Sequence, residues 1–200
     1  MLDERFLQEP KIKTILDCLR AKDLSGADTS SVLPKDLENA LDTKCRCLYR
    51  DVFVARLDNF HSETNNSLLT AVCGEIGNNA FDHNPGAWRD IAGLYFNWEI
   101  NGFAIFIDRG KGVLETLSKV MPNIATAQEA LRVAFTERIS GRSPEQRGNG
   151  LKFVVKVATT QKWDLYFQSG TGFCEISNGQ MNFGNVASPV FGCVALLKYK

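Results

Sequence analysis

The sequence predicts an α+β sandwich, in which helices cover one face of a mixed, mostly antiparallel sheet. Three observations lead to this fold class. Asn101-Gly102 joins two apolar runs, which is a strong signal for a β-hairpin. Amphipathic segments of helical period lie on both sides of that hairpin. In the last third of the chain, Gly170 and Asn178-Gly179 separate apolar runs, as turns between antiparallel strands do.

The part of the chain before the hairpin is predicted to be mainly helical. Residues 1–24 carry apolar side chains at helical spacing, and a second, short helix is expected near residues 35–42. Residues 47–57 (CLYRDVFVARL) alternate in a way that favours a strand. Ser62 is expected to cap a helix that runs to about Asp82. We therefore expect an N-terminal helical extension over residues 1–44 and a single domain over residues 45–200.

The part after the hairpin is predicted to alternate between helices and strands. The expected helices are 113–120, 126–138 and 150–160, and the expected strands are 163–168, 172–176 and 190–199. Residues 139–149 (ISGRSPEQRGN) are polar and are expected to form a loop.

Composition excludes several classes of protein. The chain has 200 residues and 44% hydrophobic content, which suits one domain with its own core. Lys+Arg and Asp+Glu both number 23, and this balance argues against a broad nucleic-acid surface. Charged or amide residues interrupt every apolar run before the roughly 20 residues that a membrane helix needs. Six cysteines without a C-x-x-C pair and only two histidines argue against a zinc site. The acidic start of the chain does not resemble a secretory signal, so we expect a cytoplasmic protein.

A first candidate motif is EIGNNAFDH, residues 75–83, on the helix that precedes the hairpin. Glu75 and Asn79 lie one turn apart on a polar stripe that borders the predicted buried face, so the stripe is expected to line a cleft. Asn79 offers a neutral oxygen ligand for Mg²⁺. Glu75 is a candidate general base. The alternative is that both are ordinary polar residues at a helix border.

A second candidate motif follows the apolar run IFI and consists of Asp108, Gly110 and Gly112. A carboxylate at the end of a buried strand can accept a hydrogen bond from an amino group such as adenine N6. Glycines allow the backbone to pass close to a flat ring. The alternative is an ordinary Asp-Gly turn. We interpret the neighbouring Arg109 and Lys111 as solvated loop charges.

A third candidate motif, RGNG, opens the predicted helix at residue 150. The N–H groups at a helix start favour phosphate, although a plain helix start explains Gly148 and Gly150 equally well. The polar loop before it has almost nothing to bury, so residues 139–149 are predicted to act as a lid. Arg142 and Arg147 are then candidates to reach phosphate.

In this order and spacing, the three motifs resemble the GHKL ATPase superfamily, which includes gyrase B, histidine kinases and anti-sigma-factor serine kinases. The resemblance covers roughly residues 45–200. The matching residues are Glu75, Asn79 and Ala80 in E-x-x-x-N-A; Asp108, Gly110 and Gly112 in D-x-G-x-G; and Gly148, Gly150 and Leu151 in G-x-G-[LF].

Two further positions refine this resemblance. His83 falls where anti-sigma kinases tend to carry histidine. Gly192-Cys193 stands where the superfamily commonly has Gly-Thr, which puts one hydrogen bond to phosphate or water in doubt.

The resemblance implies the Bergerat ATP-binding fold, with ATP and Mg²⁺ as cofactors. The implied roles are Asp108 for adenine, Gly110 and Gly112 for the shape of its pocket, Asn79 for Mg²⁺, Arg147, Gly148 and Gly150 for phosphate, Glu75 as the base, and His83 and Cys193 as further nucleotide-binding residues.

Two functions remain open at this level. One is an enzyme, either a protein serine/threonine kinase of the anti-sigma type or a slow ATPase. The other is a nucleotide-dependent binding module in which lid closure switches a protein interface. Both imply a protein partner and neither nucleic acid nor membrane; a homodimer is left open.

Overall fold

The protein is described by a computed structural model over residues 8–20, 41–89, 91–137 and 150–200. Within these ranges the strands form one five-stranded sheet in the order β1-β2-β3-β5-β4. The strands are β1 (Arg46–Cys47), β2 (Leu94–Asn97), β3 (Phe103–Asp108), β4 (Asp164–Ser177) and β5 (Gln180–Lys198). Neighbouring strands pair antiparallel at each of the four positions in this order.

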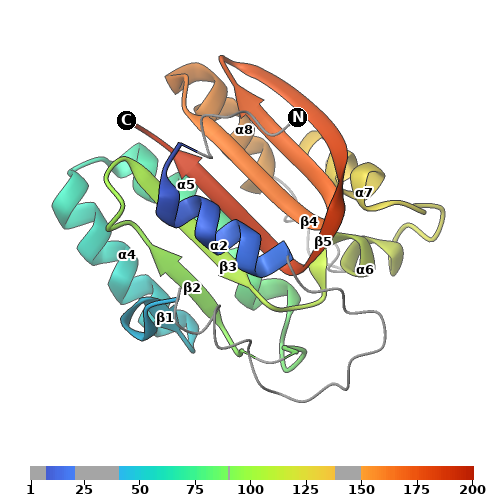
Figure 1. Ribbon diagram of the computed structural model, residues 1–200, viewed down its shortest axis with the longest axis horizontal. Coiled ribbons are helices and arrows are strands. Elements are labelled where there is room, and N and C mark those ends of the chain that lie inside the picture. The colour runs from blue at the N-terminus through green and yellow to red at the C-terminus, as the bar shows by residue number, and fades with distance from the viewer. Residues whose placement is uncertain (1–7, 21–40, 90, 138–149) are drawn as a thin grey trace.

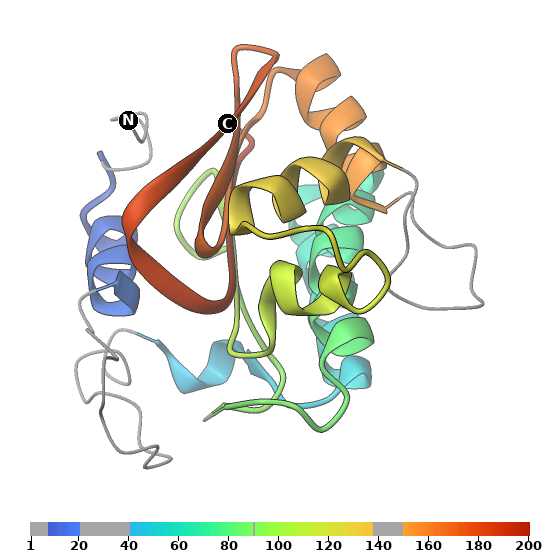
Figure 2. The same cartoon turned by 90° about the vertical axis from the view of Figure 1, so that its right-hand side faces the viewer.

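Most helices lie on one face of the sheet (Figures 1 and 2). They are α4 (Arg50–Thr64), α5 (Ser67–His83), α6 (Gly112–Ser118), α7 (Ala127–Thr136) and α8 (Gly150–Gln161). The predicted α+β sandwich is therefore confirmed. The helix α2 (Pro10–Arg20) lies on the opposite face, and a short 3₁₀ helix, η1 (Thr43–Cys45), precedes β1.

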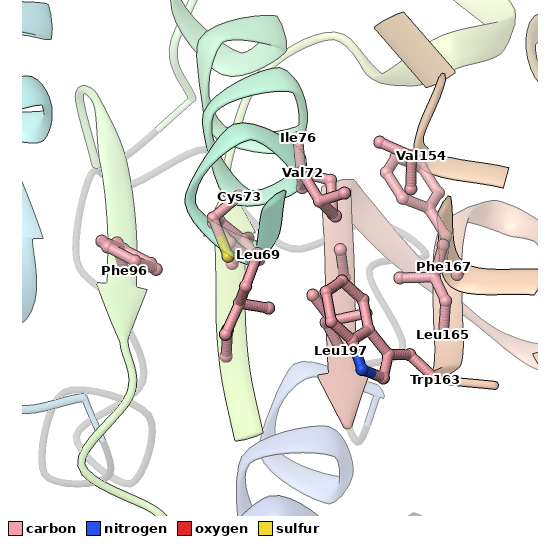
Figure 3. Packing of buried hydrophobic residues seen from close by; sticks show 14 of the residues in the cluster. Leu69, Val72, Cys73, Ile76, Phe96, Val154, Trp163, Leu165, Phe167 and Leu197 are labelled. Carbon is pink, nitrogen blue, oxygen red and sulfur yellow. The ribbon is translucent and has the colours of Figure 1, made fainter. Parts of the chain in front are cut away.

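The main core lies between the sheet and the helices α4, α5, α7 and α8. Figure 3 shows how α5 contributes to it through four side chains, Leu69, Val72, Cys73 and Ile76. Phe96, Val154, Trp163, Leu165, Phe167 and Leu197 from other elements surround them. Because this apolar face of α5 is fixed against the sheet, the polar stripe beside it is fixed as well.

A second core lies under α2 on the other face of the sheet. Ile12 and Leu16 of α2 have no solvent-exposed surface. They belong to one cluster with residues of four strands, which include Tyr95, Ile105, Tyr166 and Leu196. The sheet is thus covered on both faces, and among the described residues α2 is the helix that covers the second face.

Several predicted elements have the expected positions. The hairpin β2–β3 turns at Asn101-Gly102, where Gly102 has a φ of 82° that glycine adopts without strain. The three helices expected after it correspond to α6, α7 and α8. The helix predicted over residues 1–24 corresponds to α2 within the described residues. The short helix expected near 35–42 falls almost entirely outside them.

The strand predicted over residues 47–57 is wrong, because α4 occupies most of this segment. Phe53 and Phe60 are fully buried and Leu57 packs beside them, which is a helical spacing. Val52 and Val54, whose branched side chains favoured a strand, are exposed on α4. The 11-residue window ended before Phe60, so the helical period was not visible in it.

Two boundaries also differ from the prediction. The helix expected to start at Ser62 is interrupted, since Asn65 has a φ of 47° and the side chain of Asn66 caps α5 through Leu69 N at 3.0 Å. The three C-terminal strands are two long ones, β4 and β5, which turn at Asn178-Gly179. Gly170 lies at a register shift between them and not at a turn.

None of the helices in the described part of the chain is long and apolar enough to cross a membrane.

Candidate functional site

The helix α5 carries the residues of the first motif at intervals of four. Glu75 is exposed, while Asn79 and His83 are partly buried, and His83 is the last residue of the helix. Ile76 and Ala80, which follow Glu75 and Asn79 in the chain, belong to the main core. The motif therefore forms the predicted polar stripe beside a buried face.

The first and third motifs meet at the N-terminus of α8. A methyl group placed on Gly150, the first residue of α8, would lie 2.3 Å from Oε2 of Glu75. That distance is far below van der Waals contact, so the Glu75 carboxyl lies directly against the start of α8. Glycine at position 150 allows this approach. Arg147 and Gly148, with the lid predicted over residues 139–149, lie outside the described residues.

The second motif places Asp108 at the end of β3, where its side chain is 7% exposed. Its Oδ1 accepts hydrogen bonds from Gly110 N at 2.9 Å and from Asn84 Nδ2 at 3.2 Å. Asn84 also donates to Ala80 O at 2.9 Å and accepts from Lys111 N at 2.8 Å. Asn84 thus joins the end of α5 to the loop between β3 and α6.

The strands β4 and β5 complete the surroundings of Asp108. Cys193 on β5 is the registered partner of Asp108 on β3. Ser169 on β4 donates to Gly192 O at 3.0 Å and accepts from Val113 N at 2.9 Å. The Cys193 thiol lies 3.7 Å from Ser169 Oγ. Ser169 therefore ties the start of α6 to β5, beside the carboxyl group of Asp108.

The Asp108 carboxyl has a higher pKa than an ordinary aspartate. Burial raises its pKa to about 6, and hydrogen bonds from Gly110 N–H, the Cys193 side chain and Asn84 oppose that rise. Burial also raises the pKa of the Cys193 thiol well above its usual value, and the nearby Asp108 carboxylate adds to this effect. At neutral pH the site therefore contains an ionised carboxylate beside a protonated thiol.

The glycines around Asp108 are required by the packing of the protein itself. A methyl group on Gly110 would lie 2.0 Å from the side chain of Asn84, and one on Gly192 would lie 2.1 Å from Asp108 O. Gly112 and Gly192 also have positive φ values of 79° and 76°. The loop can therefore keep this shape only with glycine at these positions.

The interpretation of Arg109 as a solvated loop charge is wrong. Its side chain is 8% exposed, and its guanidinium carbon lies 5.8 Å from the centre of the Phe191 ring. Arg89 lies over the same ring at 3.7 Å. Phe191, which is distant in the sequence, contributes an apolar surface to the surroundings of Arg109. Lys111 is partly exposed.

Two residues of the site, Asn84 and Ser169, were missed in the sequence. Asn84 follows the first motif directly, but the predicted helix ends at about Asp82 and gives Asn84 no role. Ser169 falls just after the strand predicted over residues 163–168, where it and Gln168 follow apolar residues. Polar residues that break a buried strand were the available signal, because a buried hydroxyl needs a hydrogen-bond partner.

The described residues contain no group of three or more His, Cys, Asp or Glu side chains that would hold a metal ion by themselves. The chain matches no protein-family model and no curated protein.

Proposed function

We propose that this chain binds Mg–ATP and uses it for slow hydrolysis or for phosphoryl transfer to a protein partner, as anti-sigma-type serine/threonine kinases do. The observation that carries the proposal is that α5 joins the start of α8, a candidate phosphate position, to the buried Asp108 carboxyl, a candidate base position. Near its middle, Glu75 lies against the start of α8. At its end, Asn84 binds the buried carboxyl group of Asp108. Nine residues of helix separate these ends by about 13 Å, which suits a nucleotide lying along α5.

We assign each residue a role from the motif to which it belongs, and for the described residues this role fits the surroundings. Asp108 accepts a hydrogen bond from the amino group of adenine, with Gly110, Gly112 and Cys193 around it. Asn79 and His83 lie between the two ends, and Asn79 holds Mg²⁺. The first N–H groups of α8 at Gly150 bind phosphate, together with Gly148 and Arg147. Glu75 acts as the general base. A cytoplasmic location and a protein partner belong to the same proposal.

One observation favours the alternative, a nucleotide-dependent switch for a protein interface with little turnover. A catalytic base is usually oriented by a hydrogen bond from a third group. Glu75 is exposed, and its carboxyl lies against Gly150, which has no side chain that could orient it. In the switch, the contact between Glu75 and Gly150 would change when nucleotide enters between them.

Calorimetry with Mg²⁺ and a non-hydrolysable ATP analogue tests the nucleotide site. Asp108→Asn should weaken binding by about 1–3 kcal/mol, because an acceptor-only carboxylate becomes a group that also carries donors. Asn79→Ala should weaken binding only when Mg²⁺ is present. Wild-type protein that binds no adenine nucleotide would exclude the proposal, and unchanged affinity in Asp108→Asn would remove Asp108 from the adenine site.

A second experiment separates the two functions. The protein is incubated with ATP labelled at the γ-phosphate, with and without a cell lysate. A labelled protein band that disappears in Glu75→Ala supports the kinase, and free phosphate alone supports the ATPase. A protein that binds nucleotide but releases no label, and that holds a partner only with the ATP analogue, supports the switch.

A further inference from the structure

The side chain of Asn84 is buried beside the site and forms hydrogen bonds through all of its polar groups. It follows α5 directly and is only 3% exposed. Its carboxamide nitrogen donates to Ala80 O and to Asp108 Oδ1, and its oxygen accepts from Lys111 N. Both N–H groups and the oxygen of one carboxamide are thus used on three separate segments. This arrangement fixes the orientation of the Asn84 side chain.

The hydrogen bonds of Asn84 and Gly110 distinguish the two oxygens of the Asp108 carboxyl. The nitrogen donors from Asn84 and Gly110 both reach Oδ1, so Oδ2 receives neither of them. Gly110 leaves room for Asn84, because a side chain at position 110 would collide with the carboxamide of Asn84. The loop between β3 and α6 therefore fits the Asn84 side chain closely, and its hydrogen bonds hold that side chain in place.

We propose that Asn84 is a positioning residue for base recognition, which holds Oδ1 of Asp108 so that Oδ2 accepts a hydrogen bond from the exocyclic amino group of adenine. This inference rests on the proposed ATP-binding function. It adds Asn84, a residue outside the three sequence motifs, to the site. In this proposal Asn84 and Asp108 together distinguish purines that carry the amino group from purines that lack it.

The hydrogen bond from Asn84 also favours the ionised form of the Asp108 carboxyl, because a donor stabilises a negative charge. The other groups that face this carboxyl are the N–H of Gly110 in the loop and both the backbone N–H and the thiol of Cys193 on β5. Ser169 on β4 reaches it through Cys193. Arg109 follows in the loop, with its guanidinium over Phe191. Loss of the Asn84 donor should therefore raise the pKa of Asp108, whereas a purely structural role for Asn84 would leave it unchanged.

The first test follows the carboxyl titration of Asp108 by carbon-13 NMR in the full chain without ligand. Asn84→Ala should move the midpoint to higher pH than in wild type. Asn97→Ala is the matched control, since Asn97 is also buried, donates to Tyr95 Oη at 2.9 Å and accepts from Glu99 N at 2.8 Å. An unchanged midpoint in Asn84→Ala would overturn the proposal.

A second variant, Asn84→Asp, carries the test if Asn84→Ala does not fold. Its new carboxyl group still accepts from Lys111 N but donates to Asp108 only while the two carboxyl groups share a proton. Binding of the Mg²⁺–ATP analogue should therefore fall as the pH rises, whereas in wild type it should rise through about pH 6. A variant that follows the wild-type pH profile would contradict the role of Asn84.

The last test compares two probes, a non-hydrolysable ATP analogue and purine riboside triphosphate, which lacks the exocyclic amino group. Wild type should prefer the ATP analogue by about tenfold or more, and Asn84→Ala should reduce this preference to about twofold or less. If wild type binds neither probe, the proposed function and the adenine role of Asn84 fail together. If wild type discriminates and Asn84→Ala discriminates equally, the role of Asn84 alone is overturned.

Discussion

The two faces of the sheet bury polar side chains in different ways. On the face under α2, Asn97 donates to the hydroxyl of Tyr95 at 2.9 Å, and Tyr166 donates to Gln168 at 2.8 Å. Each pair joins positions i and i+2 of one strand, which point to the same face. On the face under α5, the buried group is the carboxyl of Asp108 with its N–H donors.

The difference lies in charge. The pairs under α2 are neutral, and burial raises the pKa of Tyr95 to about 12, so its hydroxyl stays protonated at neutral pH. Such groups are buried at little cost once they are hydrogen-bonded. Asp108, by contrast, is ionised above about pH 6 at a substantial cost of desolvation. A buried charge without an evident gain in stability is typical of a functional site. By this measure Asp108 differs from the two neutral pairs, and Glu175 of β4, also 7% exposed, is a second buried carboxyl group on the side of Phe173.

The largest expected effect concerns the exposed carboxylate on the same face. Glu75→Ala should lower ATP turnover by about 10²–10⁴-fold and leave nucleotide affinity nearly unchanged, because a general base acts in the transition state. Hydrolysis and calorimetry measure the two quantities. Glu115→Ala, the same change at an exposed position of α6, should alter neither. Intact turnover in Glu75→Ala would remove the base from the site and favour the switch.

The next largest effect is on the free energy of unfolding, through the burial of Asp108 on the α5 face. The pKa of Asp108 in the folded state is about 6, above its ordinary value of 3.8. Protonated Asp108 therefore makes its full contribution to the free energy of unfolding below about pH 4. This contribution is lost as the pH rises through about 6 and the carboxyl ionises in the folded protein. At 1.36 kcal/mol per pKa unit, the loss is about 3 kcal/mol.

Asp108→Asn should abolish this loss, since the oxygen of the carboxamide can still accept from Gly110 and Asn84. Relative to wild type, the variant should gain up to about 3 kcal/mol in unfolding free energy between pH 4 and pH 8. Denaturant unfolding at several pH values measures the gain. Tyr166→Phe, on the other face, should run parallel to wild type. Parallel curves for Asp108→Asn would show that its burial carries no such cost.

The sequence was sufficient for elements whose signals are local. The Asn101-Gly102 hairpin, α6, α7 and α8 follow from turn residues and from apolar periodicity, and each was predicted close to its observed bounds. α4 was not, because its decisive residue, Phe60, lies beyond the segment whose alternation favoured a strand. β4 and β5 were divided, because Gly170 indicates a turn and a bulge equally well.

The sequence motifs of the site could be predicted, but the hydrogen bonds that join them could not. Residue types and spacing pointed to Glu75 and Asp108, and the structure puts each against a glycine of the motifs. The links through Asn84 and Ser169 span 24 and 56 residues of sequence, respectively. No local pattern encodes such long-range hydrogen bonds, because they depend on how the helices pack on the sheet. For the same reason the burial of Arg109 beside Phe191 was not visible.

The smallest expected effect tests whether the two faces are energetically independent. Tyr95→Phe removes the hydroxyl that accepts from Asn97 Nδ2, and the buried N–H group left without that acceptor should cost about 1–2 kcal/mol of stability. Nucleotide affinity should not change, because Tyr95 packs in the core under α2. Tyr95 and Asp108 lie on neighbouring strands, but their side chains point to opposite faces of the sheet and are not in contact. Changes at side chains that share no partner add in their effects. The double variant Tyr95→Phe/Asp108→Asn should therefore show the sum of the two single changes in denaturant unfolding at pH 8, within about 0.5 kcal/mol. A larger deviation would mean that the sheet transmits strain between its faces, and the neutral pairs would then contribute to the Asp108 site instead of only filling the core beneath α2.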